Sequence, residues 1–376
     1  MSLNFYKITP IDTLFFRDGR PYNLGESNQN DVESMFPPTP FTVVGGLRAA
    51  IAKNLGWNGK GTWGNVNQIT DKIGNHNNLG SINFYGPFIM IENETNKSNE
   101  ILYPLPKNIR LKIKKSEETE KKYIKSYEVK KIKPTNKITS DLGTIDFPME
   151  PENNEDSDSK YIYINGYVNK KDLETLLSED NPTNKINIYT NDNIFENEYT
   201  VGIKRNASKL TVEEGNLFSR QFVRMKSKVH FVIGCDGCEE LSTKIDRSLI
   251  MLGGESKGAY VQKIDNIELP NVKVNYDSKF IVYFATPTRL DGISLNGEIK
   301  EIGNAKLVSG CIDKPVMIGG WDFNEGPQEL KSFIPQGTVF FMEKEGNDTI
   351  DNLNNKKIGD SSNSNFGFGH ILIGKW

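Results

Sequence analysis

Cysteine and histidine are scarce in this chain of 376 residues, which has three of each. A small odd number of cysteines in a long chain argues against a disulfide framework and fits a reducing compartment. Cys235 and Cys238 form one Cys-x-x-Cys pair, but a structural zinc needs four ligands. Cys311 and His230 are the only further candidates away from the chain ends. We interpret the pair as part of a glycine-rich turn and expect no metal and no cofactor.

Long apolar runs are also missing. No stretch approaches the roughly 18 residues that a membrane span requires, and the N-terminus has no basic region followed by an apolar run. The hydrophobic fraction of 36%, with 10% aromatics, can fill ordinary globular cores. We therefore expect a cytoplasmic protein without a membrane partner, and at roughly 100 to 200 residues per domain the length predicts two domains.

The net charge of −3 hides an uneven distribution. Between Lys107 and Lys137 there are twelve Lys or Arg against four Glu, with Tyr123 and Tyr127 among them, whereas residues 141–159 carry seven acids and no base. A basic strip with interleaved aromatic rings suits single-stranded RNA, whose phosphates attract cations and whose bases stack on rings. A solvated insertion that is Lys-rich for solubility explains the same pattern.

The order of secondary-structure patterns predicts an α+β protein. Residues 3–9 are typical of a strand, a loop rich in glycine and proline follows, and a helix is expected from Pro40, with Thr39 as its N-cap. Further strands are predicted at 82–91, 161–168, 228–234, 280–286, 316–323, 338–343 and 370–376, and helices at 170–178 and 239–252. We expect one domain over residues 1–195, with an insertion at about 107–160, and a second over 196–376.

The helix from Pro40 contains an arginine within its apolar stripe. Arg48 lies one turn after Val44, so its guanidinium either pairs with a group of this same chain or points outward to a phosphate. Gly45 and Gly46 each cost about 0.5 to 1 kcal/mol against Ala in a helix. Something must therefore approach that backbone closely, and a bound RNA or a packed strand would serve.

Three other segments have the composition of nucleic-acid contacts. The loop after the first strand places Arg17, Asp18 and Arg20 around a turn glycine, where two arginines could clamp a phosphate; an Arg17–Asp18 ion pair is the alternative. Glycines at 253, 254, 367 and 369 could expose backbone N–H groups to a phosphate, but no P-loop pattern is present. We expect Arg17, Arg20 and Arg48 to share one RNA-facing surface.

These motifs, together and in order, resemble the third subunit of the type III-B CRISPR (Cmr) effector complex, a member of the RAMP superfamily. The resemblance rests on residues 10–22, 34–51, 252–255 and 319–322 and on the C-terminal Gly-Phe-Gly segment. It implies two ferredoxin-like (RRM-like) domains, binding of the 5′ tag of the guide (CRISPR) RNA, contacts with the large polymerase-like subunit and with backbone RAMP subunits, and no active site. The RNA-binding set that follows is Arg17, Asp18, Arg20, Thr39, Thr42, Gly45, Gly46, Arg48, Gly253, Gly254, Lys257, Gly367, Gly369 and His370.

Two other functions compete with this hypothesis. A RAMP-type endoribonuclease that processes the guide precursor would need a general base, and His370 is the only histidine in a glycine-rich motif. A pure protein-interaction scaffold would bind no RNA. Trp321 and Phe323, beside Gly319 and Gly320, are candidates for a partner interface or for a core strand.

Overall fold

A computed structural model describes residues 3–17, 31–75, 78–93, 98–114, 125–141, 143–151, 158–180, 182, 184–205, 208–209, 212–240, 243, 245, 247–274, 278–322, 326–344 and 350–376. The chain forms two compact units, each assembled from three segments. The first unit contains residues 1–87, 195–265 and 317–331, and the second contains 88–194, 266–316 and 332–376. One junction lies between residues 194 and 195, one residue before the boundary expected from the sequence, and the expected division into two continuous domains stays a prediction.

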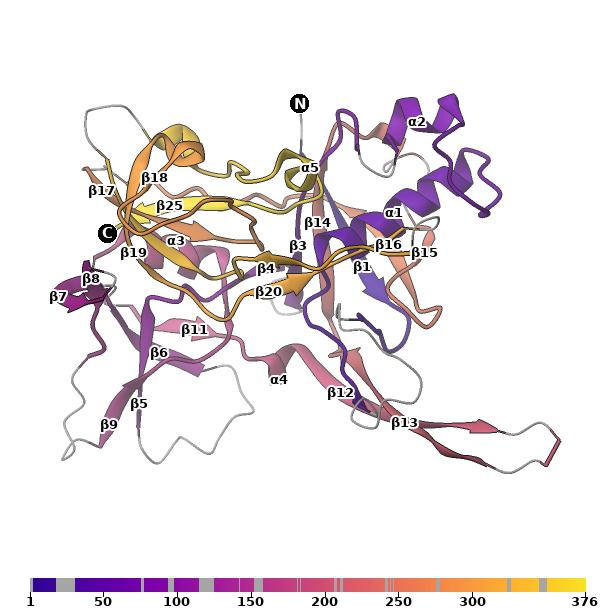
Figure 1. The fold of residues 1–376 in the computed structure, drawn as a ribbon, viewed down its shortest axis with the longest axis horizontal. Coiled ribbons are helices and arrows are strands. Elements are labelled where there is room, and N and C mark those ends of the chain that lie inside the picture. The colour runs from indigo at the N-terminus through magenta and orange to yellow at the C-terminus, as the bar shows by residue number, and fades with distance from the viewer. Residues whose placement is uncertain are drawn as a thin grey trace. The chain divides into compact units, whose positions relative to one another are not determined.

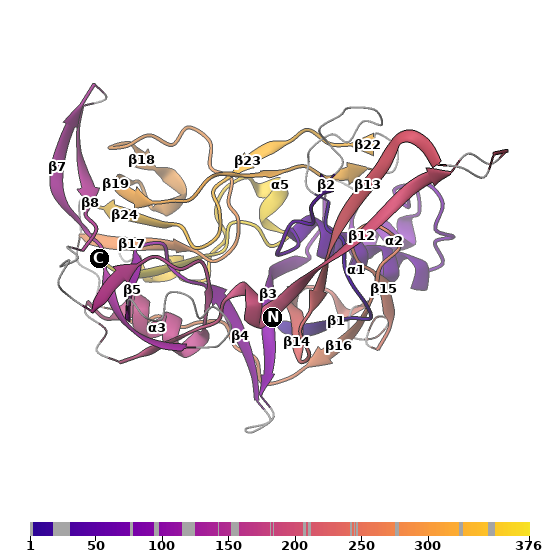
Figure 2. The same ribbon diagram turned by 90° about the horizontal axis from the view of Figure 1, so that it is seen from below.

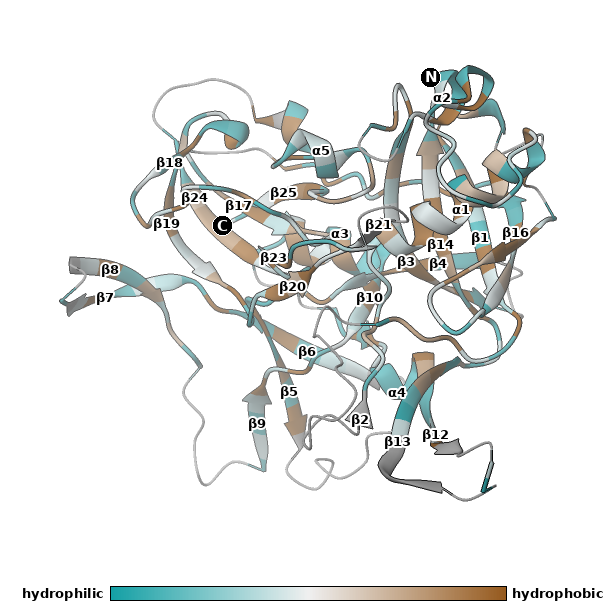
Figure 3. Ribbon diagram, turned by 45° about the vertical axis from the view of Figure 1, so that its right-hand side comes forward, coloured by the Kyte–Doolittle hydropathy of each residue, from teal (hydrophilic) through white to brown (hydrophobic). Residues whose placement is uncertain are grey.

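The first unit is built on an antiparallel sheet. Strand β1 (Asn4–Pro10) lies between β14 (Val229–Asp236) and β16 (Gly258–Ile264) and is antiparallel to both, and β15 (Leu249–Met251) pairs with β16. Strand β14 is buried along almost its whole length, and Figure 3 shows its hydrophobic residues. Because both of its faces are covered, it is mostly apolar and lacks the alternation of a half-exposed strand.

Helix α1 (Pro40–Asn54) begins where the sequence predicts. The Thr39 hydroxyl accepts a hydrogen bond from the Thr42 backbone N–H at 3.3 Å, and Pro40 occupies the first turn. The helix buries Val44, Leu47 and neighbouring apolar residues and packs against β15. Helix α2 (Asn67–Ile73) follows and is anchored by its buried Ile69 and Ile73.

A long β-hairpin also belongs to the first unit. Strands β12 (Phe195–Arg205) and β13 (Val212–Met225) pair antiparallel from Phe195 opposite Met225 onward, and Figures 1 and 2 both show them as an extended two-stranded ribbon. This hairpin was not predicted from the sequence. The remaining elements of the unit are β2 (Asp31–Val32), which is parallel to β13, β21 (Trp321–Asp322) and β22 (Gly326–Pro327).

The second unit contains a five-stranded sheet with the order β18–β19–β24–β17–β25. Its core includes Phe280, Phe284 and Met342. The strands are β17 (Lys279–Phe284), β18 (Glu298–Ile299), β19 (Ala305–Cys311), β24 (Val339–Glu343) and β25 (Ile371–Lys375). Helix α3 (Lys170–Ser178) packs on β25 and buries three leucines.

A second sheet of this unit, with the order β11–β6–β5–β9, is made largely from the basic region. It contains β5 (Ile109–Lys114), β6 (Lys125–Lys131), β9 (Ser159–Ile162) and β11 (Ile186–Ile188), and β7 (Pro134–Ser140) forms a separate hairpin with β8 (Gly143–Pro148), visible in Figure 2. Other elements are β4 (Ser98–Pro104), β10 (Tyr167–Asn169), α4 (Asn191–Ile194), α5 (Ser361–Ser364) and the 3-10 turns Lys300–Ile302 and Asp351–Leu353. Three strands include residues of both units: β3 (Asn83–Asn93), β20 (Val316–Ile318) and β23 (Lys331–Phe333).

The chain is thus a mixed protein of mostly antiparallel sheets with few helices, which is the coarse class predicted. The helix expected over 239–252 is wrong in its last part, because residues 249–251 form β15 and Arg247 adopts a positive φ of 61° that no α-helix allows. The strand expected over 161–168 is divided into β9 and β10, and the one over 316–323 is divided at Gly319 and Gly320. None of the described helices is both long and apolar enough to cross a membrane.

Candidate nucleic-acid interface

The loop after β1 is fixed by backbone hydrogen bonds on two sides. Leu14 exchanges both backbone hydrogen bonds with Val223 of β13, and the Phe15 carbonyl accepts from the Gly254 N–H at 2.8 Å. At Gly253, with a φ of +79°, an added Cβ would lie 2.4 Å from the Phe15 carbonyl oxygen. This glycine therefore allows its own chain to pack closely. The same tight contact keeps any ligand out of that space.

Aromatic rings hold the next part of the loop on β14. Phe16 and Phe36 each lie about 6 Å from the ring of Phe231, and the Phe16 N–H donates to the Ser34 hydroxyl at 2.8 Å. Arg17 follows and is exposed, with a β-bridge to Ser34. Arg17 thus lies on a segment that ring contacts and backbone hydrogen bonds hold in place. Asp18 and Arg20, which the sequence analysis grouped with it, lie outside the described residues.

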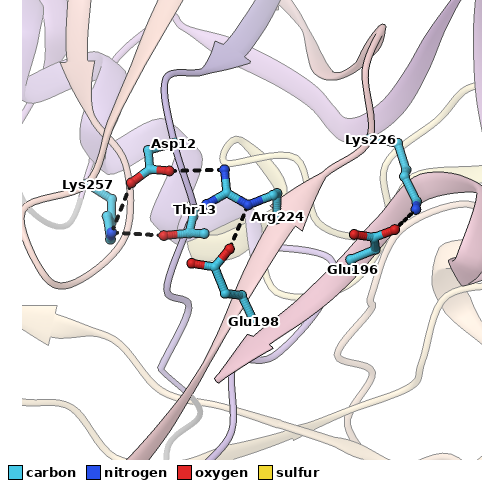
Figure 4. Close-up of polar contacts among 7 residues, drawn as sticks. All are labelled: Asp12, Thr13, Glu196, Glu198, Arg224, Lys226 and Lys257. Atoms are coloured by element: carbon cyan, nitrogen blue, oxygen red, sulfur yellow. Dashed lines mark hydrogen bonds and ion pairs between the residues drawn. The ribbon is translucent and has the colours of Figure 1, made fainter. Parts of the chain in front are cut away.

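A cluster of charged side chains lies where this loop meets the β12–β13 hairpin (Figure 4). The Asp12 carboxylate lies 3.1 Å from Arg224 and 3.7 Å from Lys257, and Arg224 also binds Glu198 at 2.7 Å. Lys257 donates to the Thr13 hydroxyl at 2.9 Å. A hydrogen bond from the Thr13 backbone and interactions with Arg224 and Lys257 lower the pKa of Asp12 despite its partial desolvation. We call Asp12, Thr13, Glu198, Arg224 and Lys257 the Asp12 cluster.

Of the Asp12 cluster, sequence reasoning identified only Lys257. Arg224 and Glu198 belong to the hairpin that the sequence analysis missed, where Lys226 also pairs with Glu196. The signal was present in residues 199–203, in which Tyr199, Val201 and Ile203 alternate with Thr200 and Gly202 as in a strand. Those three apolar side chains are 66%, 70% and 49% exposed.

The start of α1 distinguishes the two helical glycines. Beyond Gly45 there is open space, because an added Cβ would have no atom within 4 Å, whereas one at Gly46 would lie 2.4 Å from the Met251 carbonyl oxygen. Gly46 is therefore needed for the packed strand β15. Thr39 and Thr42 are joined by the cap hydrogen bond and by a contact of 3.1 Å between their hydroxyls, so both are engaged in starting the helix.

Arg48 is buried, with 4% of its surface exposed. Its guanidinium donates to the Ile73 carbonyl from Nε at 3.2 Å and from Nη2 at 2.9 Å, and Nη2 also donates to the Asn75 carbonyl at 2.5 Å. Trp63 covers it, with its ring centre 5.3 Å from Cζ. Of the two alternatives left open by the sequence, this geometry supports the one in which Arg48 binds its own chain, at the C-terminal end of α2. Its expected place on an RNA-facing surface has no support here.

The C-terminal glycine motif belongs to the second unit. Gly367 and Gly369 have φ values of 112° and 76°, and a Cβ at Gly369 would lie 1.9 Å from the Ile358 carbonyl oxygen. His370 is fully buried, its Nε2 lies 2.9 Å from the Asn355 side-chain oxygen, and its backbone N–H donates to the Thr286 hydroxyl. Burial lowers the pKa of His370 to about 3. The imidazole is therefore neutral near pH 7, as expected of a core residue.

Over its described part the basic strip forms ordered strands and the turn before them, in which some basic side chains are exposed while others, such as Lys131, are buried. In β5 Ile109, Leu111 and Ile113 are buried and the residues between them are basic, and Lys112 pairs with Glu128 across to β6. Tyr123 and the flanking lysines lie outside the described residues, as do His76, Phe323 and the side chain of Trp321. Among the residues that the structure describes, no three His, Cys, Asp or Glu side chains are grouped so as to hold a metal ion.

Comparison with known proteins places the chain in a class. The model of the family described as CRISPR-associated protein (Cas_Cmr3) matches residues 6–376. The chain is thus a CRISPR-associated protein. More narrowly, it belongs to the Cas_Cmr3 family.

Solved structures give a weaker likeness. A chain of the type III-B Cmr-beta complex bound to cognate target RNA and AMPPnP is 18% identical, with a TM-score of 0.49 and coverage of 90% of this chain and 86% of that one. A chain of the Csm3–Csm4 subcomplex of a type III-A interference complex is 10% identical, with a TM-score of 0.39 and coverage of 91% and 93%. No curated protein matches the chain.

Proposed function

We propose that this chain is a non-catalytic subunit that binds the 5′ tag of the guide RNA and docks the large polymerase-like subunit and backbone RAMP subunits of its Cmr complex in the cytoplasm. The observation that carries the proposal is the family match over residues 6–376. The proposal includes two ferredoxin-like domains, because mostly antiparallel sheets with few covering helices are compatible with that fold.

RNA contact is supported by the surface of the first unit. Arg17 is exposed on a loop that Phe16 and Phe36 hold against Phe231, and an arginine fork on a rigid segment is suited to a phosphate. Open space beyond Gly45 leaves one side of the α1 backbone accessible. Protein docking is supported by the exposed apolar row of Tyr199, Val201 and Ile203 on β12, since such rows mark interaction surfaces.

The absence of catalysis in this proposal has one structural argument. His370 is the base that the endoribonuclease alternative requires, and its imidazole is fully buried with a pKa lowered to about 3. A general base must reach the proton that it removes. We therefore assign His370 a structural role and expect His370→Ala to reduce thermal stability.

Affinity purification of the tagged chain from its native host tests the proposal. Co-purification of a discrete guide-sized RNA together with other RAMP subunits is expected. Recovery of protein partners without RNA, after nuclease-free lysis, would favour the pure scaffold. Purified chain incubated with guide precursor should leave it intact, and specific cleavage that is lost in a His370→Ala variant shown by circular dichroism to be folded would establish the processing enzyme.

A further inference from the structure

Two cations of the second unit are more buried than the acids that pair with them. Lys107, which lies two residues before β5 (labelled in Figure 1), and Arg110, the second residue of β5, each have 11% of the side chain exposed. Their partners Asp313 and Glu150 are 51% and 64% exposed. The two cations are thus largely buried, whereas the acids that pair with them lie on the solvent side.

The cations are held in place without these acids. Arg110 donates from Nη1 to the carbonyl oxygens of Lys107 and Ile109 at 2.9 and 3.0 Å. Lys107 donates from Nζ to the Tyr163 hydroxyl at 2.6 Å. Both cations lie over the Tyr163 ring, Nζ at 4.7 Å and the Arg110 Cζ at 5.5 Å from its centre. Removing the acids would therefore leave two positively charged groups in nearly fixed positions.

The acids bind as a phosphate would. Glu150 takes the Arg110 fork with both oxygens, one on Nε at 2.5 Å and the other on Nη2, which is the planar arrangement that guanidinium also makes with phosphate. Asp313 binds Lys107 at 2.8 Å. Burial lowers the pKa of Lys107, but hydrogen bonds to Asp313 and Tyr163 outweigh burial and raise it overall. The ammonium therefore stays charged when it binds an anion.

We propose that Lys107, Arg110 and Tyr163 form an RNA-backbone site in the second unit, which Glu150 and Asp313 mask in the free chain. RNA phosphates replace the two carboxylates, which then turn to solvent. Exposed carboxylates lose little when they leave an ion pair, because water solvates them readily. The inference rests on the proposed RNA-binding function, and it adds a site that is tested apart from Arg17.

Neutralising the mask is the decisive experiment. The double variant Glu150→Gln with Asp313→Asn removes two negative charges at the site, and Asp192→Asn with Glu298→Gln removes two at other exposed positions of the same unit. Fluorescence anisotropy with a short labelled single-stranded RNA measures the affinity of each purified chain over a salt series. The mask variant should bind roughly three- to tenfold more tightly than the charge-matched control. Adding Lys107→Gln and Arg110→Gln to the mask variant should remove that gain and lower the salt slope by about 1.4.

Three results would overturn the inference. The first is equal affinity of the mask variant and its control, and the second is a gain that persists without Lys107 and Arg110. The third is binding of labelled poly-glutamate through these cations in the absence of RNA binding, which would make the site a protein-docking site. If Arg17→Ala weakens RNA binding while the mask variant behaves as its control, this inference fails and the proposed function stands. If neither wild type nor mask variant binds RNA, both fail.

Discussion

Arg48→Ala should destabilise the first unit without affecting RNA binding. The substitution removes three hydrogen bonds to the carbonyls of Ile73 and Asn75 and the contact with the Trp63 ring. Hydrogen bonds from a charged donor contribute about 1.5 to 3 kcal/mol each, and a buried carbonyl left unpaired costs about 1 to 3 kcal/mol. Because the three bonds share one guanidinium and are not additive, we expect a loss of about 3 to 5 kcal/mol in the free energy of unfolding.

Calorimetry or circular dichroism measures this loss. For a unit of this size each kcal/mol corresponds to a Tm change of about 2 to 4 °C, so the Tm should fall by about 6 to 20 °C. Arg48→Lys retains a charge but not the planar fork and should recover only part of the loss. Burial lowers the pKa of Arg48 to about 10, so the side chain is charged throughout a neutral assay.

A different pair of results would refute the structural role of Arg48. If Arg48→Ala leaves the Tm within about 2 °C of the wild type and lowers the RNA salt slope by about 0.7, the guanidinium contacts phosphate and the structural role is refuted.

Arg17→Ala should lower the RNA salt slope by about 0.7 with no change in Tm, and an unchanged slope would remove Arg17 from the RNA surface. Gly45→Ala should raise the free energy of unfolding by about 0.5 to 1 kcal/mol in chemical denaturation, because the added methyl group enters open space beside a helix. Gly46→Ala should lower it, because the added Cβ would lie 2.4 Å from the Met251 carbonyl oxygen. Equal effects of the two substitutions would contradict this packing. Burial lowers the pKa of Lys131 to about 8 from its ordinary 10.5. Between pH 8 and 10.5 the unfolded state therefore binds more protons than the folded state, and the free energy of unfolding should rise with pH. Urea titrations at several pH values should show this rise in the wild type and not in Lys131→Met.

Local signals in the sequence were sufficient for some elements and not for others. The start of α1 was predicted because Thr39 and Pro40 determine it within a few residues. The β12–β13 hairpin was missed because the expected domain boundary after residue 195 fell at its start, although apolar residues alternate over 199–203 as in a strand. In 107–137 the number of charges concealed the period of two in Ile109, Leu111 and Ile113. Helix periodicity over 239–252 failed because pairing with β16 overrides it at β15.

The contacts of the candidate site residues could not be predicted from the sequence. A glycine that admits RNA and a glycine that admits a strand of the same chain have the same letter, and Gly46 and Gly253 are both of the second kind. Arg48 within an apolar stripe was correctly identified as unusual, but its partners Ile73 and Asn75 are 25 and 27 positions away. The Asp12 cluster joins three separate segments, and no spacing rule in one sequence links them.

The interleaving of the two units has a consequence for synthesis of the protein. The first unit includes residues 317–331, and the second ends with β25 near the C-terminus. When the ribosome has synthesised the chain up to residue 265, both units therefore still lack segments. Neither can complete its fold, although many apolar strands have already been synthesised. Such nascent chains are prone to aggregate and depend on chaperones. We expect a cut at 195, between the two halves of the linear sequence, to yield two insoluble fragments, whereas co-expression of both fragments should restore a soluble complex.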